Sequence, residues 1–355
     1  MIRTYKAIQI TKPGKLNLVE LPIREPGPGQ VRIRVEACGV CHSDVATVEG
    51  QYPGLILPRV PGHEVVGRID AVGADVSNWK IGQRVGVGFF GGQDDQCDSC
   101  QRGDFVNCLH PVVTGITVDG GYAEVTIAEA RALASIPDEL KSAEAAPLLC
   151  AGITTFNALR NAGLRAGDLV AIQGVGGLGH LGIQFARRMG FKTVALNRGN
   201  EKEKLAKDLG AHVYIDTSAD DAAVVLQRMG GADAILATAP KGDAMAALMG
   251  GLAVHGKLIV VAVPNDTMPI NPFPIVFGER SIIGSLTGKA IDNQDTLDFS
   301  VLQNVRPMIE TVPLERAAEA YTKMMAGKAR FRMVLTMTAD ASSSPKGITR
   351  AEARS

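Results

Sequence analysis

The sequence predicts an α/β protein of two domains, one β-rich and barrel-like and the other built on a doubly wound parallel sheet. With 355 residues the chain is long for a single hydrophobic core. Its first part reads as short strands separated by Gly and Pro, whereas strands and helices alternate from about residue 153 onward. We therefore expect residues 1–152 and 285–337 to form the β-rich domain and residues 153–284 the parallel-sheet domain. Residues 338–355 are polar and are expected to form a mobile tail.

The composition excludes several classes of partner. Lys plus Arg equals Asp plus Glu at 37 each, so no net charge attracts nucleic acid or an anionic membrane. The first six residues lack the apolar run of a signal peptide, and the apolar segment 258–263 is too short to span a bilayer. We expect a cytoplasmic protein with reduced cysteines whose partners are small molecules.

The β-rich domain is predicted from period-two alternation. Residues 30–37 alternate polar and apolar side chains, which is typical of a strand with one buried face, and residues 64–72 and 82–87 behave similarly. Gly and Pro at residues 25–29 indicate a turn. The prediction is an antiparallel sheet with few helices, whose loops carry the reactive residues.

Three side chains of this domain form a candidate zinc site: Cys41, His63 and Cys150. They are about 20 and 90 residues apart, so only a folded domain can bring them together. Two thiolates and an imidazole leave the fourth position of a tetrahedral zinc ion open, as in catalytic sites. The alternative is that the cysteines are small buried residues and the histidine is a hydrogen-bonded core residue.

A second cysteine cluster predicts a structural zinc site. Cys97 and Cys100 form a C-x-x-C pair, and Cys108 follows. A closed site needs a fourth ligand, and Asp94 lies three residues before Cys97 with a carboxylate that zinc accepts. Asp95 competes for this role, and a loop without metal is the alternative.

The parallel-sheet domain opens with a dinucleotide-binding pattern. A buried strand at residues 168–173 leads into Gly174, Gly176 and Gly179, which have the G-x-G-x-x-G spacing, and a helix follows to about residue 190. The glycines allow a tight turn and a close approach of the pyrophosphate to the helix N-terminus. A second strand is expected at residues 193–196, and further strands near residues 213–215, 234–237 and 258–263.

The end of the second strand indicates which dinucleotide binds. An acidic residue there would bind a ribose 2′-hydroxyl, but this chain has Asn197 and Arg198, which suit a 2′-phosphate. We therefore favour NADP over NAD. Glu201 and Glu203 lie nearby, and Arg198 could instead be a solvated surface charge. Beyond this domain, a helix at residues 314–325 and a strand at 330–336 are expected to return to the first domain.

Taken in chain order, these motifs resemble the zinc-dependent medium-chain alcohol dehydrogenases over nearly all of residues 1–337. The motifs are Cys41-His42-Ser43-Asp44, Gly62-His63-Glu64, the cysteine-rich loop, Cys150-Ala151-Gly152-Ile153-Thr154 and the glycine turn. The resemblance implies a GroES-like catalytic domain, a Rossmann domain and a cleft between them. It also implies a homo-oligomer, either a tetramer or a dimer.

The resemblance further implies roles for individual residues. Glu64 resembles a carboxylate that approaches the zinc, and Asp44 the partner that orients His63. Ser43 resembles the hydroxyl that takes the alcohol proton while hydride passes to the nicotinamide. The implied dinucleotide contacts are His42, Thr154, Gly174, Gly176, Gly177, Leu178, Gly179, Asn197, Arg198 and Arg332.

Two departures from the family pattern are expected to matter. Many relatives continue the proton path to a histidine three residues after the serine, where this chain has Ala46, so the path should end in water. Asp94 replaces a cysteine, which affects the structural zinc site. Tyr52 and Phe90 fall where relatives place aromatic walls of the substrate pocket, and we expect primary aliphatic or aromatic alcohols and aldehydes as substrates.

Several alternatives remain at this stage. Polyol dehydrogenases usually have glutamate as the third zinc ligand, which Cys150 argues against, and zinc-free quinone reductases lack the cysteine and histidine ligands. A cinnamyl-alcohol-type NADPH aldehyde reductase is the nearest enzyme alternative. A non-catalytic redox sensor that binds zinc and a dinucleotide is the alternative from another class.

Overall fold

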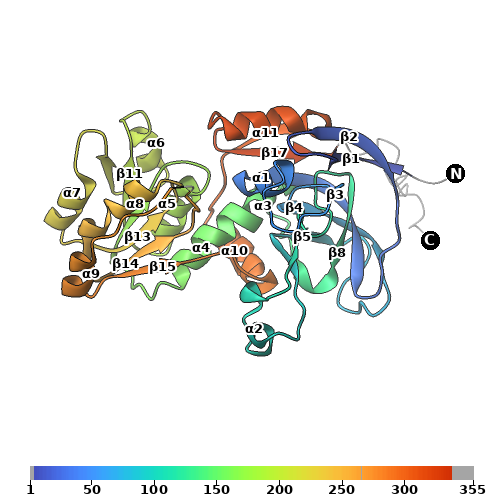
Figure 1. Cartoon of the computed structure of the whole chain (residues 1–355), viewed down its shortest axis with the longest axis horizontal. Helices are drawn as coiled ribbons and strands as arrows, with labels where there is room; N and C mark the ends of the chain where they lie inside the picture. Colours follow the sequence, from blue (N-terminus) through green and yellow to red (C-terminus); the bar gives the residue numbers. More distant parts are fainter. Residues whose placement is uncertain (1–3, 265, 338–355) are drawn as a thin grey trace, which may run out of the picture.

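A computed structural model describes residues 4–264 and 266–337 of the chain (Figure 1). The tail expected at 338–355 lies outside the described residues. The strands are β1 (Thr4–Ile10), β2 (Leu16–Pro22), β3 (Gln30–Val40), β4 (Val65–Val72), β5 (Arg84–Val87), β6 (Phe90–Gly92), β7 (Val112–Val113), β8 (Val125–Glu129), β9 (Leu133–Ser135), β10 (Leu169–Gln173), β11 (Lys192–Asn197), β12 (Val213–Asp216), β13 (Ala232–Ala237), β14 (Leu252–Val260), β15 (Ser281–Gly284), β16 (Ile309–Pro313) and β17 (Arg332–Thr336).

The α-helices are α1 (Val45–Val48), α2 (Asp98–Gln101), α3 (Ser142–Pro147), α4 (Ile153–Arg160), α5 (Gly179–Arg188), α6 (Glu203–Asp208), α7 (Ala222–Arg228), α8 (Gly242–Ala246), α9 (Pro272–Gly278), α10 (Ala290–Leu302) and α11 (Ala317–Met325). Short 3₁₀ helices are η1 (His42–Asp44), η2 (Phe105–Asn107), η3 (Ala130–Ala132), η5 (Met249–Gly251) and η6 (Leu314–Arg316). The element η4 (Leu148–Gly152) is a π-helical turn.

The second part of the chain forms a parallel six-stranded sheet in the order β12-β11-β10-β13-β14-β15. Numbered along the chain, this is the 3-2-1-4-5-6 order of doubly wound dinucleotide-binding folds. All five residues of β10 are buried, as expected for a central parallel strand covered on both faces. The chain order reverses between β10 and β13, which is where ligands bind in such sheets.

The first part of the chain forms a seven-stranded sheet around β3, which pairs with β4, β8 and β17. Strands β16 and β17 thus join the N-terminal strands, and Figure 1 shows α11 and β17 beside β1 and β2. The sheet is antiparallel apart from the parallel pair β16 and β17. The antiparallel pairing predicted for the strands of residues 1–150 is confirmed, whereas the strand Ile309–Pro313, which pairs in parallel with β17, was not predicted.

Three elements differ from the sequence prediction. Strand β14 covers Leu252–Val260 instead of residues 258–263, because His255, Gly256 and Lys257 interrupt the apolar pattern that predicts strands. The edge strand β15 was not predicted. The helix expected at residues 314–325 begins with the 3₁₀ turn η6 before α11.

One hydrophobic core joins the two sheets. Ala37 and Val66 of the seven-stranded sheet share a buried cluster with Leu149 of η4 and with Val170 and Ile172 of β10. Figure 1 shows α4 and α10 between the two sheets. Because η4 lies inside this shared core, Cys150 on η4 is held at the junction of the two halves. No helix among residues 4–264 and 266–337 is long and apolar enough to cross a membrane.

Candidate active site

The first predicted zinc ligands come together in the structure. Cys41 follows the end of β3, His63 precedes β4, and Cys150 lies on η4. Together with Glu64, one ligand atom of each residue lies within 4.8 Å of the others. The Sγ atoms of Cys41 and Cys150 are 3.8 Å apart. The folded chain therefore gathers residues that are far apart in sequence into one cluster that can hold a metal ion.

The imidazole of His63 is oriented toward this cluster. Its Nδ1 lies 2.9 Å from Oδ1 of Asp44, whose other oxygen accepts hydrogen bonds from the Cys41 amide at 2.9 Å and the Tyr122 hydroxyl at 2.8 Å. The opposite ring atom, Nε2, is buried and has no hydrogen-bond partner within the described ranges. A buried polar atom without a partner is costly, and a bound cation would satisfy it. The donor set therefore fits zinc.

The thiols and the imidazole of the cluster have shifted pKa values. The contact between the two sulfurs lowers the pKa of Cys41 and raises the pKa of Cys150. Burial disfavours a charged His63, but the carboxylate of Asp44 outweighs burial and raises the pKa of His63. Thiolate is the form of cysteine that binds zinc.

Glu64 is fully buried beside the cluster and pairs with Arg332, the first residue of β17. Burial raises the pKa of Glu64, and the Arg332 guanidinium opposes this effect. Gly39 provides space for the Glu64 side chain, since a β-carbon at this position would lie 1.7 Å from Oε2. The pair connects the metal cluster to the strand that returns from the C-terminal part of the chain.

The glycine turn lies next to this ion pair. Gly174 has a φ of +88°, which favours glycine, and a β-carbon on Gly179 would lie 1.7 Å from the Gly174 carbonyl oxygen. A β-carbon on Gly176 would meet no described atom within 4 Å, so the backbone there is open to a ligand. A β-carbon on Gly177 would lie 3.2 Å from Nη1 of Arg332. Arg332 therefore faces both the metal cluster and the turn.

The end of β11 carries the residues expected to select the dinucleotide. The Asn197 side chain accepts a hydrogen bond from the Val175 amide at 3.1 Å, so it braces the glycine turn. Arg198 is exposed and forms no ion pair within 4.0 Å among the described residues. Lys202 donates to the Val175 carbonyl at 2.7 Å and lies over the Phe331 ring at 5.3 Å. Burial lowers the pKa of Lys202.

The second predicted metal site also assembles. One ligand atom from each of Asp94, Cys97, Cys100 and Cys108 lies within 4.8 Å of the others. Backbone amides point at two of the sulfurs: Leu109 N lies 3.5 Å from Cys97 Sγ, and Asp94 N lies 3.4 Å from Cys108 Sγ. Amide hydrogen bonds stabilise thiolates, so this loop also fits zinc.

Asp94, and not Asp95, belongs to this cluster. Asp95 pairs with Arg131 and accepts a hydrogen bond from Gln93. Asp94 Oδ1 accepts from the amides of Gln96 at 2.9 Å and Cys97 at 3.0 Å, and these bonds help to lower its pKa. Its Oδ2 lies 2.8 Å from Nδ1 of His110. One lone pair of Oδ2 remains for a metal ion.

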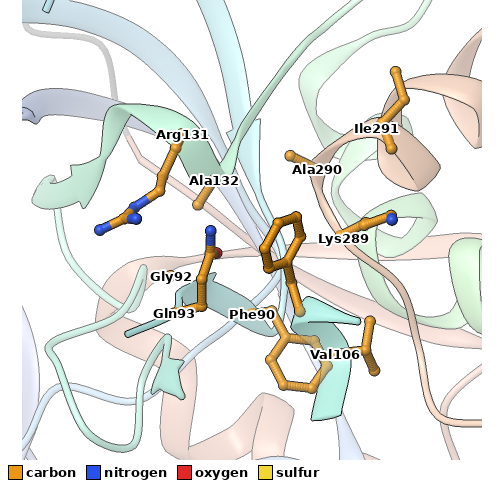
Figure 2. A pocket seen from close by; sticks show the side chains of 10 residues that line it. Phe90, Gly92, Gln93, Val106, Arg131, Ala132, Lys289, Ala290 and Ile291 are labelled. Carbon is orange, nitrogen blue, oxygen red and sulfur yellow. The ribbon is translucent and has the colours of Figure 1, made fainter. Parts of the chain in front are cut away.

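The residues expected to line the substrate pocket are not all brought together. Ser43 is exposed on η1, and Tyr52 is half-buried and donates its amide to the Ala46 carbonyl at 3.1 Å. Phe90 lines a separate cavity of about 320 Å³ between β6, η2, η3 and the start of α10, whose lining includes neither residue (Figure 2). Phe89 instead packs edge-on against His63, with ring centroids 5.3 Å apart. Phe89 therefore places an aromatic ring directly against a residue of the metal cluster.

Sequence reasoning missed several of these residues. Phe89 stands beside Phe90, and an apolar pattern cannot tell which ring faces the cluster. Gly39, Tyr122 and Lys202 act through contacts with residues far away in the chain, which no local pattern reveals. His180 is fully buried at the start of α5, and its place directly after the glycine turn was the one available signal.

The fold and the site define a class of protein. A buried cluster of two cysteines and a histidine, joined through Arg332 to a dinucleotide-binding turn, is a site for metal-assisted hydride transfer. The sheet order and the glycine turn supply the dinucleotide half, and the seven-stranded sheet supplies the metal half.

Comparison with known proteins identifies the family. Residues 27–138 match the family model of the alcohol dehydrogenase GroES-like domain, and residues 177–302 match that of the zinc-binding dehydrogenases. The chain is 42% identical over 338 residues to the alcohol dehydrogenase notN of Aspergillus sp. (strain MF297-2), covering 94% of this chain and 98% of the relative. It is 40% identical over 334 residues to an alcohol dehydrogenase of Geobacillus stearothermophilus, with the same coverage.

A solved structure agrees with these relatives. The CAD protein of Helicobacter pylori, solved as a complex with NADP(H), superimposes with a TM-score of 0.82 at 28% identity, covering 95% of this chain and 99% of that chain. The chain belongs to the zinc-dependent medium-chain alcohol dehydrogenase family. It is an alcohol dehydrogenase with a GroES-like domain and a Rossmann domain, and it uses zinc and a nicotinamide dinucleotide to interconvert alcohols and aldehydes.

Proposed function

We propose that this enzyme is an NADP-preferring dehydrogenase of primary alcohols and aldehydes. In this proposal Cys41, His63 and Cys150 hold the catalytic zinc. Asp44 orients His63, and Glu64 is the nearby carboxylate available during ligand exchange. Bound zinc supplies a Lewis acid that lowers the pKa of an alcohol and polarises an aldehyde carbonyl.

Ser43 takes the alcohol proton in the oxidation and returns it in the reduction. Its hydroxyl is exposed on η1, two residues after Cys41. Because Ala46 cannot continue a proton path, the proton passes from Ser43 to water. His42, Thr154 and Arg332 contact the dinucleotide together with residues 174–179.

The observation that carries this proposal is the position of Arg332. Its guanidinium pairs with Glu64 at the metal cluster and faces Gly177 in the glycine turn. A dinucleotide whose pyrophosphate lies on the turn would have a cation beside it, and its nicotinamide end would extend toward the cluster. The proposed division into residues 1–152 with 285–337 and residues 153–284 places this guanidinium at the junction.

The preference for NADP rests on Arg198. The guanidinium is exposed and carries no ion pair within the part of the chain that the structure describes, so it is available to a 2′-phosphate. Asn197, which stands where an acidic residue would select NAD, is instead hydrogen-bonded to the turn.

The proposed substrates are primary aliphatic or aromatic alcohols and their aldehydes. Phe89 packs against the metal ligand His63, and Tyr52 lies on the turn after α1. Aromatic walls of this kind suit flat or medium-length apolar groups. Phe90 belongs to this pocket only if the cavity of Figure 2 opens toward Ser43 when substrate binds.

We also propose that Asp94, Cys97, Cys100 and Cys108 hold a structural zinc and that the enzyme is a cytoplasmic homo-oligomer. All six cysteines are free, which suits a reducing compartment. Strand β15 lies at an open sheet edge, and large apolar side chains are exposed near it. They are Val263, Phe273, Val276, Phe277 and Leu286. A second copy would cover this edge, giving a dimer or a tetramer.

The proposal is tested by measuring turnover from the absorbance of the reduced cofactor. The substrates are a panel of primary, secondary and aromatic alcohols and aldehydes, and NADP(H) and NAD(H) are used in parallel. We expect turnover that a zinc chelator abolishes and a kcat/KM at least about tenfold higher with NADP(H). Arg198→Ala should reduce that ratio by about tenfold. Lys204→Ala is the matched control, because Lys204 is an exposed cation on α6 that already pairs with Asp208 at 2.7 Å.

Other outcomes would identify the alternatives. Turnover that favours NAD(H) would refute the NADP preference and keep the enzyme. Efficient reduction of cinnamyl-type aldehydes, with little oxidation of their alcohols, would favour the NADPH aldehyde reductase. Dinucleotide binding without turnover in zinc-replete protein would favour the redox sensor.

A further inference from the structure

We propose that His180 is a positioning residue that sets the distance between the dinucleotide-binding turn and the metal cluster. The inference deepens the proposed function and rests on it. His180 is the second residue of α5 and is fully buried, and neither of the two sites described above uses it.

Both ring nitrogens of His180 bind backbone groups from different parts of the fold. Nδ1 lies 2.8 Å from the carbonyl oxygen of Gly176, in the centre of the glycine turn. Nε2 lies 3.1 Å from the amide nitrogen of Met308, just before β16. Because the Met308 amide can only donate, Nε2 must accept, and Nδ1 must then carry the proton that it donates to Gly176. The imidazole is therefore neutral, with a defined tautomer.

The connection continues from Met308 to the metal cluster. The Met308 carbonyl accepts hydrogen bonds from the amides of Phe331 at 3.0 Å and Arg332 at 3.1 Å. The side chain of Arg332 then pairs with Glu64. A continuous series of hydrogen bonds thus runs from the glycine turn through His180 and Met308 to a residue of the metal cluster.

A ring contact supports the same connection. The imidazole of His180 stacks on Phe331, with centroids 5.1 Å apart and planes 26° apart. Lys202 lies near the same Phe331 ring and donates to the turn at Val175. Phe331 immediately precedes Arg332, so its packing fixes where the guanidinium can lie.

Burial keeps the His180 imidazole neutral, which its hydrogen bonds to Gly176 and Met308 require. Burial lowers the pKa of His180 to about 4, and the charge of Arg332 acts in the same direction. A protonated ring would bring an N–H group against the N–H of Met308 and break the connection. Hydride transfer requires the nicotinamide at a fixed distance from the substrate, and a small displacement lowers its rate severely.

The test compares three variants of the zinc-loaded full-length enzyme. His180→Leu has a similar size and removes both hydrogen bonds. In His180→Gln, the side-chain oxygen can still accept from Met308, so it is the conservative variant. Gln184→Leu is the control, because Gln184 lies one turn further along α5 and binds the Arg306 backbone, at 2.9 and 3.1 Å, and the His180 backbone carbonyl, at 3.1 Å. Among the described residues it forms no hydrogen bond to the His180 ring or to Met308.

We expect His180→Leu to lower kcat/KM by about tenfold or more and to raise the primary deuterium isotope effect on kcat, with unchanged zinc content. His180→Gln should have a kcat within about threefold of the wild type and an isotope effect equal to that of the wild type. Gln184→Leu should lower stability without changing the isotope effect. An isotope effect in His180→Leu equal to that of Gln184→Leu would overturn the inference.

Hydrogen exchange separates this inference from the proposed function. In His180→Leu, amide exchange should accelerate both at residues 174–179 and at 308–332. In His180→Gln, only the turn should exchange faster. Lack of turnover by the wild type would refute the proposed function and the catalytic part of the inference, and unchanged exchange at 308–332 in His180→Leu would refute the connection itself.

Discussion

Gly39 lies against the carboxylate of Glu64, so closely that a β-carbon on Gly39 would lie 1.7 Å from Oε2 and 3.0 Å from the Glu64 β-carbon. Glu64 is fully buried, and its other carboxylate oxygen, Oε1, pairs with Arg332. The absence of a side chain at residue 39 therefore determines where the carboxylate beside the metal cluster can lie.

The first prediction concerns this contact. Gly39→Ala should destabilise the protein by about 1–3 kcal/mol, because the added methyl group forces Glu64 away from Arg332. It should also lower kcat, since Arg332 loses its buried partner. Denaturant unfolding and steady-state kinetics measure the two effects. Wild-type stability and kcat in this variant would show that the core around Glu64 rearranges freely.

The second prediction concerns Gly176, which has open space beside it, whereas Gly39 is tightly packed. A methyl group on Gly176 would meet no described atom within 4 Å, so Gly176→Ala should leave the free energy of unfolding within about 0.5 kcal/mol of the wild type. It should nevertheless weaken dinucleotide binding by about tenfold or more, because the pyrophosphate needs close access to this backbone. Fluorescence titration with NADPH and NADH measures the affinity. Unchanged affinity would mean that the dinucleotide does not lie on the turn.

These contacts show what the sequence could predict. The spacing and type of the residues were sufficient to predict the two clusters around Cys41 and Cys97, because few kinds of side chain bind zinc. The period-two and glycine patterns were sufficient for β3 and for the turn after β10, because local geometry produces them. The contacts of Gly39 with Glu64 and of His180 with Met308 join residues with no shared pattern. Only the packed fold reveals them.

The same reasoning explains the edge strand and the aromatic wall. Strand β15 has four residues at the edge of a sheet, and so short an apolar run carries little periodicity. Phe89 and Phe90 are adjacent and chemically identical, so the direction of each ring depends on the local path of the chain after β5. The family resemblance implied an aromatic wall at Phe90, and the structure shows in addition that Phe89 contacts His63.

The third prediction concerns the second metal cluster. Asp94→Ala should reduce the zinc content from two ions per chain toward one, because three cysteines alone leave the fourth position open. The melting temperature should fall, while the catalytic zinc remains bound. Asp94→Cys should retain two ions and raise zinc affinity. Metal analysis after dialysis measures the content, and an unchanged zinc content in Asp94→Ala would exclude Asp94 as a ligand.

His110 provides a matched comparison for that prediction. Its Nδ1 lies 2.8 Å from Asp94 Oδ2, and its side chain is 77% exposed. His110→Ala should keep two zinc ions but release one of them faster to a chelator, by about tenfold, because the carboxylate is less well oriented. Equal release rates in His110→Ala and the wild type would limit the role of His110 to a surface contact.

The fourth prediction concerns acid stability. His180 has an ordinary pKa of 6.5, and burial lowers it to about 4 in the folded protein, with Arg332 as the charged group that contributes. Between these values the unfolded chain binds a proton that the folded protein does not. The free energy of unfolding is therefore unaffected by the titration of His180 above about pH 6.5. It falls progressively as the pH is lowered to about 4, by at most about 3 kcal/mol in total.

His180→Gln isolates this effect, because glutamine does not titrate. The free energy of unfolding of the variant should fall less steeply than that of the wild type between about pH 6.5 and 4, while other acid-sensitive groups contribute equally to both. Urea unfolding at a series of pH values provides the measurement. Parallel curves for the two proteins would show that His180 titrates alike in the folded and unfolded states.

The last prediction concerns the route of the proton from Ser43. Ala46 lies on α1, three residues after Ser43 in the same turn of chain, and no titratable side chain occupies that position. Ala46→His should introduce an inflection in the pH dependence of kcat between about pH 6 and 8, because histidine exchanges protons with solvent in that range. Ala46→Gln adds similar bulk without a titrating group and serves as the control. Alcohol oxidation measured from about pH 5.5 to 9.5 with saturating cofactor compares the three proteins. Superimposable profiles for Ala46→His and Ala46→Gln would mean that proton exit to water does not limit turnover, whereas an inflection in Ala46→His alone would show that the proton leaves past residue 46.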